Sequence, residues 1–176
     1  MPELPEVETV RRGIDRVALN RRITRVEVGR ERTVRRTSRE ELIDGLSGAR
    51  IVATRRHGKY LLCDLDTGFA VMIHLRMSGR VLVVEAGTQR PPHTHVVAHL
   101  EGTSEFAPGE LWFVDPRTFG EVVVFDPEHA NELVPELARL GPDPLAPGFT
   151  AGVLADRLRG KRTNLKARSE EHTSEL

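Results

Sequence analysis

The amino terminus places Pro2 after the initiator Met1 and directly before two carboxylates, Glu3 and Glu6. If Met1 is removed, as the small Pro2 permits, the chain begins with a secondary amine. Because α-amino groups titrate at about pH 7.7–8.0, a useful fraction of this amine is an unprotonated nucleophile. Attack on a sugar C1′ would give an iminium intermediate, and Glu3 and Glu6 could transfer protons. The alternative is structural: a proline and acids at the start of a helix, favoured by the helix dipole.

Other reactive or contact-forming side chains each have an ordinary structural interpretation as well. Lys59 lies in a His-Gly-Lys-Tyr segment that is typical of a turn between strands, where an exposed hairpin lysine is unremarkable. Met77 could belong to a core and Phe119 could anchor a loop. His93 and His95 have the spacing of alternate strand residues, so we expect both on one side. Two histidines without neighbouring cysteines or suitable carboxylates are weak evidence for a metal site, and we predict no catalytic metal.

Length and composition allow one good core and the beginning of a second within 176 residues. No apolar run is long enough to span a membrane, and the acidic start is unlike a signal peptide. The single cysteine, Cys63, lies in an apolar run and is predicted to be a buried, inert thiol. These features favour a monomeric protein of a reducing cytoplasm.

The formal net charge is zero, but the charge is unevenly distributed. Between Arg11 and Lys59 there are fifteen arginines and lysines against six acids. Clustered arginines attract phosphate backbones in a salt-dependent way. A solvated face of an arginine-rich protein is the alternative, and composition alone does not establish nucleic-acid binding.

The pattern of apolar residues predicts the elements that must position these side chains. Val7, Val10, Ile14 and Val17 recur at helical spacing, which predicts an opening helix that fixes Pro2. A capping box at Ser38 predicts a second short helix. Strands are predicted near residues 23–28, 50–56, 60–65, 69–75, 80–85, 95–100, 110–114 and 121–125. Further helices are predicted at 127–139 and after Thr150. Many short strands with a helix at one end favour a mainly β fold, a two-layer antiparallel β-sandwich with flanking helices.

Six motifs together carry a resemblance to a known family. The segment MPELPEVETVRRG is followed by HGKYLL at 57–62, HLRMSG at 74–79, the histidine segment at 93–95, DPRTFG at 115–120 and LGPDPL at 140–145. In this order they resemble the formamidopyrimidine-DNA glycosylases, bacterial base-excision repair enzymes of the formamidopyrimidine glycosylase/endonuclease VIII family. The resemblance extends to about Lys166. The form Glu-Leu-Pro-Glu favours the branch that removes oxidised purines, 8-oxoguanine and formamidopyrimidines.

The resemblance implies a DNA glycosylase and abasic-site lyase that acts on damaged double-stranded DNA. It implies an N-terminal β-sandwich, Pro2 as nucleophile, and Glu3 and Glu6 as proton-transferring acids. Lys59 would contact phosphate and donate a proton during β-elimination, and the family cleaves the strand by β- or β,δ-elimination. The residues matching those that fill the hole left by an extruded nucleotide are Met77, Arg117 and Phe119, and those matching DNA contacts are His93, Arg117 and Lys161.

The resemblance also implies three segments. Residues 1–139 would be the catalytic β-sandwich domain, and 140–167 a linker with the start of a truncated helix-two-turns-helix region. The family's structural Zn²⁺ lies in a C-terminal zinc finger that this sequence lacks, so we expect no cofactor. Residues 168–176 match the in-frame translation of the sequencing adapter AGATCGGAAGAGCACACGTCTGAACTC, and we expect them to be a non-native tail. Because phosphate contacts supply much of the affinity for DNA and much of the family's binding surface is missing, we expect weak or no activity of this chain.

Two other functions remain open at this point. An oxidised-pyrimidine glycosylase of the endonuclease VIII branch would share the same nucleophile and most of the same motifs. A non-catalytic fragment that only binds lesions would share the fold while Pro2 performed no chemistry.

Overall fold

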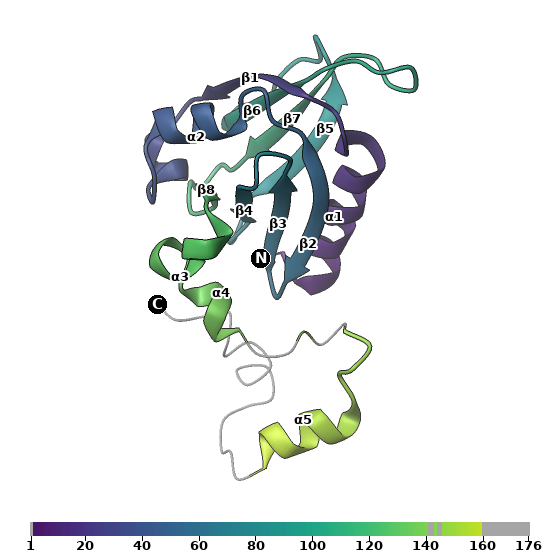
Figure 1. Ribbon diagram of the computed structural model, residues 1–176, viewed down its shortest axis with the longest axis vertical. Coiled ribbons are helices and arrows are strands. Elements are labelled where there is room, and N and C mark those ends of the chain that lie inside the picture. Colours follow the sequence, from purple (N-terminus) through teal and green to yellow (C-terminus); the bar gives the residue numbers. More distant parts are fainter. Residues whose placement is uncertain (1, 141–142, 144–145, 160–176) are drawn as a thin grey trace.

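The computed structural model describes residues 2–140, 143 and 146–159 (Figure 1). Its centre is a pair of four-stranded antiparallel sheets packed face to face. The strands are β1 (Ile23–Val28), β2 (Ile51–His57), β3 (Tyr60–Leu65), β4 (Ala70–His74), β5 (Arg80–Glu85), β6 (Thr94–Leu100), β7 (Gly109–Val114) and β8 (Glu121–Phe125). The predicted β-sandwich is confirmed, and each predicted strand agrees within one residue at either end.

One sheet has the order β1-β6-β7-β5 and the other has the order β2-β3-β4-β8. The second sheet is covered on both faces, which explains its continuous apolar runs. In β4, Val71 and Ile73 join the core between the sheets, whereas Ala70 and Met72 join a second cluster with Val134 on the outer face. Successive side chains of β4 therefore point alternately into two apolar clusters, and neither face of this strand is open to solvent.

The opening helix α1 (Leu4–Ala18) lies along one side of the sandwich and contacts β2 and β5, an edge strand from each sheet (Figure 1). Its predicted apolar stripe is confirmed, since Val7, Ile14 and Ala18 are buried in the main core. The helix therefore closes one open side of the sandwich. Its N-terminus, which carries Pro2, is fixed by the same packing.

Shorter helices complete the described chain. They are η1 (Glu31–Val34), α2 (Arg39–Leu46), η2 (Pro127–His129), α3 (Ala130–Leu133), α4 (Glu136–Arg139) and α5 (Ala151–Leu158). Both predicted caps are confirmed: Ser38 accepts from the Glu41 N–H and Thr150 from the Val153 N–H. None of the helices described is long and apolar enough to cross a bilayer.

The helical prediction over 127–139 is confirmed for most of this range, but the helix is interrupted. Three short segments occupy this range, and the break between α3 and α4 falls at Val134 and Pro135. A proline disfavours helical geometry in the residue before it, and Val134 leaves the helical region with φ −131° and ψ 55°. The break turns the buried Val134 onto the outer face of the second sheet.

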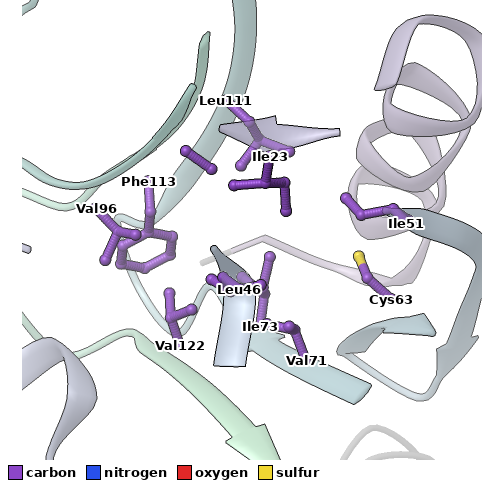
Figure 2. Close-up of a pocket in the computed structure, with 11 residues that line it drawn as sticks. Ile23, Leu46, Ile51, Cys63, Val71, Ile73, Val96, Leu111, Phe113 and Val122 are labelled. Atoms are coloured by element: carbon purple, nitrogen blue, oxygen red, sulfur yellow. The ribbon is translucent and has the colours of Figure 1, made fainter. Parts of the chain in front are cut away.

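A cavity of about 30 Å³ lies between the two sheets (Figure 2). Its walls are entirely apolar and include Ile23, Ile73, Phe113 and the thiol-bearing Cys63. A buried water needs polar partners, which this cavity does not offer. It is a packing defect in the core, and Cys63 is buried as predicted.

Candidate active site

Pro2 is half buried and directly precedes α1. Glu3 is the N-cap of that helix, and its backbone N–H donates to the carboxylate of Glu6, forming a capping box. Pro5 occupies the first turn, where its missing N–H costs nothing. The structural interpretation of the amino terminus is therefore confirmed: this segment is a well-formed helix start, and it holds Pro2 beside Glu3 and Glu6.

Lys59 lies at the tip of the β2–β3 hairpin, after Gly58, whose φ of 58° suits glycine. The turn is as predicted, but the lysine is not an ordinary exposed one. It is only 5% exposed, and its Nζ lies 2.8 Å from the Glu3 Oε2. The fold thus brings together Glu3 and Lys59, which are far apart in the sequence, next to Pro2.

Arg56 fixes this hairpin to the opening helix, a role that the sequence did not indicate. Its side chain is 6% exposed and forms ion pairs with Glu8 at 3.3 Å and with Asp143 at 2.7 Å. It also donates to the Gly58 carbonyl oxygen at 2.9 Å. Hydrogen bonds from Arg11 and Arg12 lower the pKa of Glu8 to about 2, outweighing burial. Glu8 is therefore a permanent anion that anchors the arginines of both elements.

His74 is a second buried group at this end that sequence reasoning missed, although it begins the HLRMSG motif. It pairs with Tyr60 across β3 and β4, and the two ring centroids lie 4.3 Å apart. Burial, followed by the charge of Arg76, lowers the pKa of His74 to about 3. The imidazole is neutral at physiological pH. The motif itself was the signal that could have identified it.

The three predicted void-filling residues lie on two neighbouring loops. Met77 is 45% exposed in the loop after β4, and Arg117 and Phe119 lie in the loop between β7 and β8. The Arg117 guanidinium lies 5.2 Å from the centroid of the Phe119 ring. An exposed methionine beside an exposed cation and an aromatic ring is a surface typical of contact with a partner.

One carboxylate ties the two loops together. Asp115 is fully buried and accepts hydrogen bonds from the Ser78 hydroxyl, from the Gly120 N–H at 2.7 Å and from the Arg117 N–H at 3.2 Å. The motifs HLRMSG at 74–79 and DPRTFG at 115–120 each end in a glycine for a steric reason. A Cβ on Gly79 would lie 2.5 Å from the Leu75 carbonyl oxygen, and one on Gly120 would lie 2.5 Å from Phe113.

Glu121 forms a second link beneath these loops. Its buried carboxylate pairs with Arg35 at 2.6 Å, Arg36 at 2.5 Å and Arg76 at 3.2 Å. Burial raises the pKa of Glu121, but the hydrogen bond and charge of Arg36 outweigh it, so the pKa lies below its ordinary value. This ion-pair cluster could not be predicted from the sequence, because its arginines come from separate segments.

The two histidines are not alternate residues of one strand, although their rings lie edge to face with the centroids 6.4 Å apart. Strand β6 begins at Thr94, and His93 precedes it with a left-handed φ of 68°. His93 is exposed, whereas His95 is buried and its Nε2 lies 2.8 Å from the Asp115 carbonyl oxygen. No cluster of potential metal ligands occurs among the described residues. The predicted contact residue Lys161 lies outside the described residues.

Comparison with known proteins decides the family. The model of the formamidopyrimidine-DNA glycosylase N-terminal domain matches residues 1–122. The chain belongs to the formamidopyrimidine-DNA glycosylase family. It is 44% identical over 167 residues to the formamidopyrimidine-DNA glycosylase of Symbiobacterium thermophilum, covering 95% of this chain and 52% of that protein. The Synechocystis relative is 41% identical, with 94% and 59% covered.

Solved structures of the family agree with this assignment. The Lactococcus lactis enzyme bound to DNA with an abasic site is 29% identical, with a TM-score of 0.82, and the match covers 98% of this chain and 61% of that one. Its complex with DNA containing a formamidopyrimidine lesion has a TM-score of 0.81 at 30% identity, covering 97% and 62%. A further complex contains DNA with an oxidised pyrimidine. The chain spans somewhat more than half the length of its curated relatives.

Proposed function

We propose that the chain carries the catalytic centre of a base-excision DNA glycosylase and abasic-site lyase that acts on oxidised purines. The observation that carries the proposal is the placement of Glu3 and Lys59, joined at 2.8 Å, at the helix start that holds Pro2. The relatives' name and the structures of DNA complexes support it.

In the proposed reaction the Pro2 nitrogen lone pair forms a bond to C1′ of the damaged nucleotide. The glycosidic C1′–N bond breaks, and the departing base takes up the proton that the Pro2 nitrogen loses after its attack. Glu3 then protonates the sugar ring oxygen as the C1′–O4′ bond breaks, which leaves a cationic iminium. Glu6 supports proton movement and holds Glu3 through the capping box.

Strand cleavage follows by elimination from the iminium. Loss of a C2′ proton expels the 3′ phosphate, and a second elimination expels the 5′ phosphate. Lys59 assists these steps as a proton donor and contacts a phosphate near the lesion. An ammonium already paired with Glu3 is suitably placed, because it lies beside the acid that handles the ring oxygen.

Chemistry at C1′ requires the damaged base to leave the stack, at a cost of about a few kcal/mol. We propose that Met77 and Phe119 fill the space left behind and that Arg117 hydrogen-bonds the orphaned partner base. The exposure of Met77 and the shared anchoring of both loops on Asp115 support this assignment. His93 and Lys161 are proposed as further DNA contacts.

Borohydride trapping tests the nucleophile, because only an iminium is reduced to a stable protein–DNA crosslink. We expect a crosslink with abasic-site DNA at low salt, and loss of that crosslink after acetylation of the terminal amine. A chain with a free Pro2 that binds the DNA but forms no crosslink would indicate a non-catalytic lesion-binding module.

Lys59 is tested separately with Lys59→Met. We expect trapping to persist while strand cleavage slows by about 10²-fold, the usual contribution of a positioned acid or base. A matched panel of duplexes with 8-oxoguanine, formamidopyrimidine and oxidised pyrimidines separates the purine from the pyrimidine assignment.

A further inference from the structure

The turn around η1 displays arginines on a rigid base. Thr33 and Val34 are 0% and 1% exposed, so they anchor the turn in the core. Arg30, Arg32 and Arg35 are exposed on the same turn. The two buried residues hold the turn against the core, and the three arginines extend from it toward solvent.

Arg32 lies beside the loop between β7 and β8, although the two are far apart in the sequence. Its guanidinium lies 5.8 Å from the centroid of the Phe119 ring, and the Arg117 guanidinium lies 5.2 Å from the same centroid. Both distances are within the range of cation–π interaction, about 6 Å. Arg35 adds a hydrogen bond to the Phe119 carbonyl oxygen at 3.2 Å. The turn and the wedge residue therefore form one surface.

The charges of Arg32 and Arg117 are not neutralised within the part of the chain that the structure describes. Neither side chain forms an ion pair with a described residue. The nearby carboxylate of Glu121 is already shared by Arg35, Arg36 and Arg76. Glu31, on the same turn, is paired with Arg39 at 3.8 Å. Within residues 2–140, 143 and 146–159, no carboxylate therefore pairs with the two guanidiniums beside the Phe119 ring.

We infer that Arg32 is a DNA-contacting residue, which binds a backbone phosphate beside the base step that Phe119 enters. This inference rests on the proposed function, since it requires duplex DNA at this surface. A wedge residue reaches the bases from a groove, so a cation held against its ring lies near the groove edge, where phosphates are. Arginine suits phosphate because its planar donors can bind in pairs.

The test measures the salt dependence of binding to a duplex that carries a tetrahydrofuran abasic-site analogue, by fluorescence anisotropy. Each phosphate contact contributes about 0.9 to the slope of log affinity against log salt. We expect Arg32→Ala to reduce the slope by about one and to weaken binding to all duplex sequences similarly. Arg32→Lys keeps the charge and should retain most of the slope.

Arg16→Ala is the matched control. Arg16 is exposed in the last turn of α1, about 20 Å along the helix from Pro2, and no slope change is expected. The inference is wrong if Arg32→Ala has the same slope of log affinity against log salt as the unmodified chain. It is also wrong if Arg32→Lys lowers that slope as much as Arg32→Ala does.

Trapping of single-stranded abasic DNA, measured in parallel, separates this inference from the proposed function. Single-stranded DNA has no stacked partner strand for Phe119 to enter, so we expect Arg32→Ala to form its crosslink at the rate of the unmodified chain. A reduced slope together with no crosslink from any variant would support Arg32 and reject Pro2 chemistry. A normal crosslink with an unchanged slope would reject Arg32 alone.

Discussion

Asp115 shows how a single side chain positions residues on two loops. Replacing it with alanine leaves the buried Gly120 N–H without its acceptor, and leaves the Arg117 N–H with only the Ser78 Oγ at 3.3 Å. Unsatisfied buried donors cost about 1–3 kcal/mol each, so we expect Asp115→Ala to lower the free energy of unfolding by about 2–4 kcal/mol. Urea denaturation measures this. Ser78→Ala removes only one donor to the same carboxylate and should cost about 1 kcal/mol; equal losses in the two variants would contradict the central role of Asp115.

His74 makes stability depend on pH in a definite direction. Its folded pKa of about 3 lies below its ordinary value of 6.5, because burial disfavours the charged form. The unfolded chain therefore binds a proton that the folded chain excludes between these pH values. The contribution is complete above pH 6.5 and is lost as pH falls toward 3, by up to about 1.4 kcal/mol per pH unit.

The corresponding variant is His74→Gln, followed by urea denaturation at a series of pH values. We expect the unmodified chain to lose stability on acidification from pH 6.5, before its carboxylates titrate. The variant should show a flatter profile between pH 6.5 and 5. Parallel profiles would show that His74 is not the group responsible.

At the scale of single residues, the sequence predicted the site residues that lie in a short, recognisable motif. Pro2, Glu3 and Lys59 could be selected because each lies in a distinctive segment. Their mutual placement, with Lys59 buried against Glu3, depends on how α1 packs on β2 and was not predictable from spacing. The role of Glu121 could not be predicted, since it comes from arginines that follow η1 and from one on the loop after β4.

At the scale of elements, two helical glycines have opposite surroundings and should respond oppositely to alanine. A Cβ on Gly13 in α1 would meet nothing within 4 Å, whereas one on Gly45 in α2 would lie 2.8 Å from Val124 Cγ2. Gly13→Ala should stabilise the chain by about 0.5–1 kcal/mol through helix propensity. Gly45→Ala should destabilise it by about 1–3 kcal/mol through overpacking. Thermal unfolding of both variants is the measurement, and shifts of the same sign would contradict the structure.

Strands were predicted well because their apolar runs are bounded by turn residues, such as those between β3 and β4. Residues 127–139 are helical over most of the predicted range, but the interruption at Val134 and Pro135 was not predicted. The alternation predicted for His93 and His95 does not occur within one strand, because the backbone at His93 is left-handed and β6 begins only at Thr94.

At the scale of the whole molecule, the chain spans only 52% of its Symbiobacterium relative. Phosphate contacts supply much of the affinity of such proteins for DNA, and a shorter chain offers fewer of them. We expect it to nick an 8-oxoguanine duplex at least about tenfold more slowly than that relative at physiological salt. Side-by-side nicking assays measure this, and equal rates would show that the shared portion is sufficient.

The buried sulfur of Cys63 has a practical consequence. It is the only cysteine in the sequence, and burial raises the pKa of its thiol to about 12. A maleimide should therefore react with the native chain only when the two sheets separate. The rate of labelling then measures the rate at which the sandwich opens. A single cysteine introduced in place of the exposed Phe69 would accept a dye selectively, with Cys63 left in place.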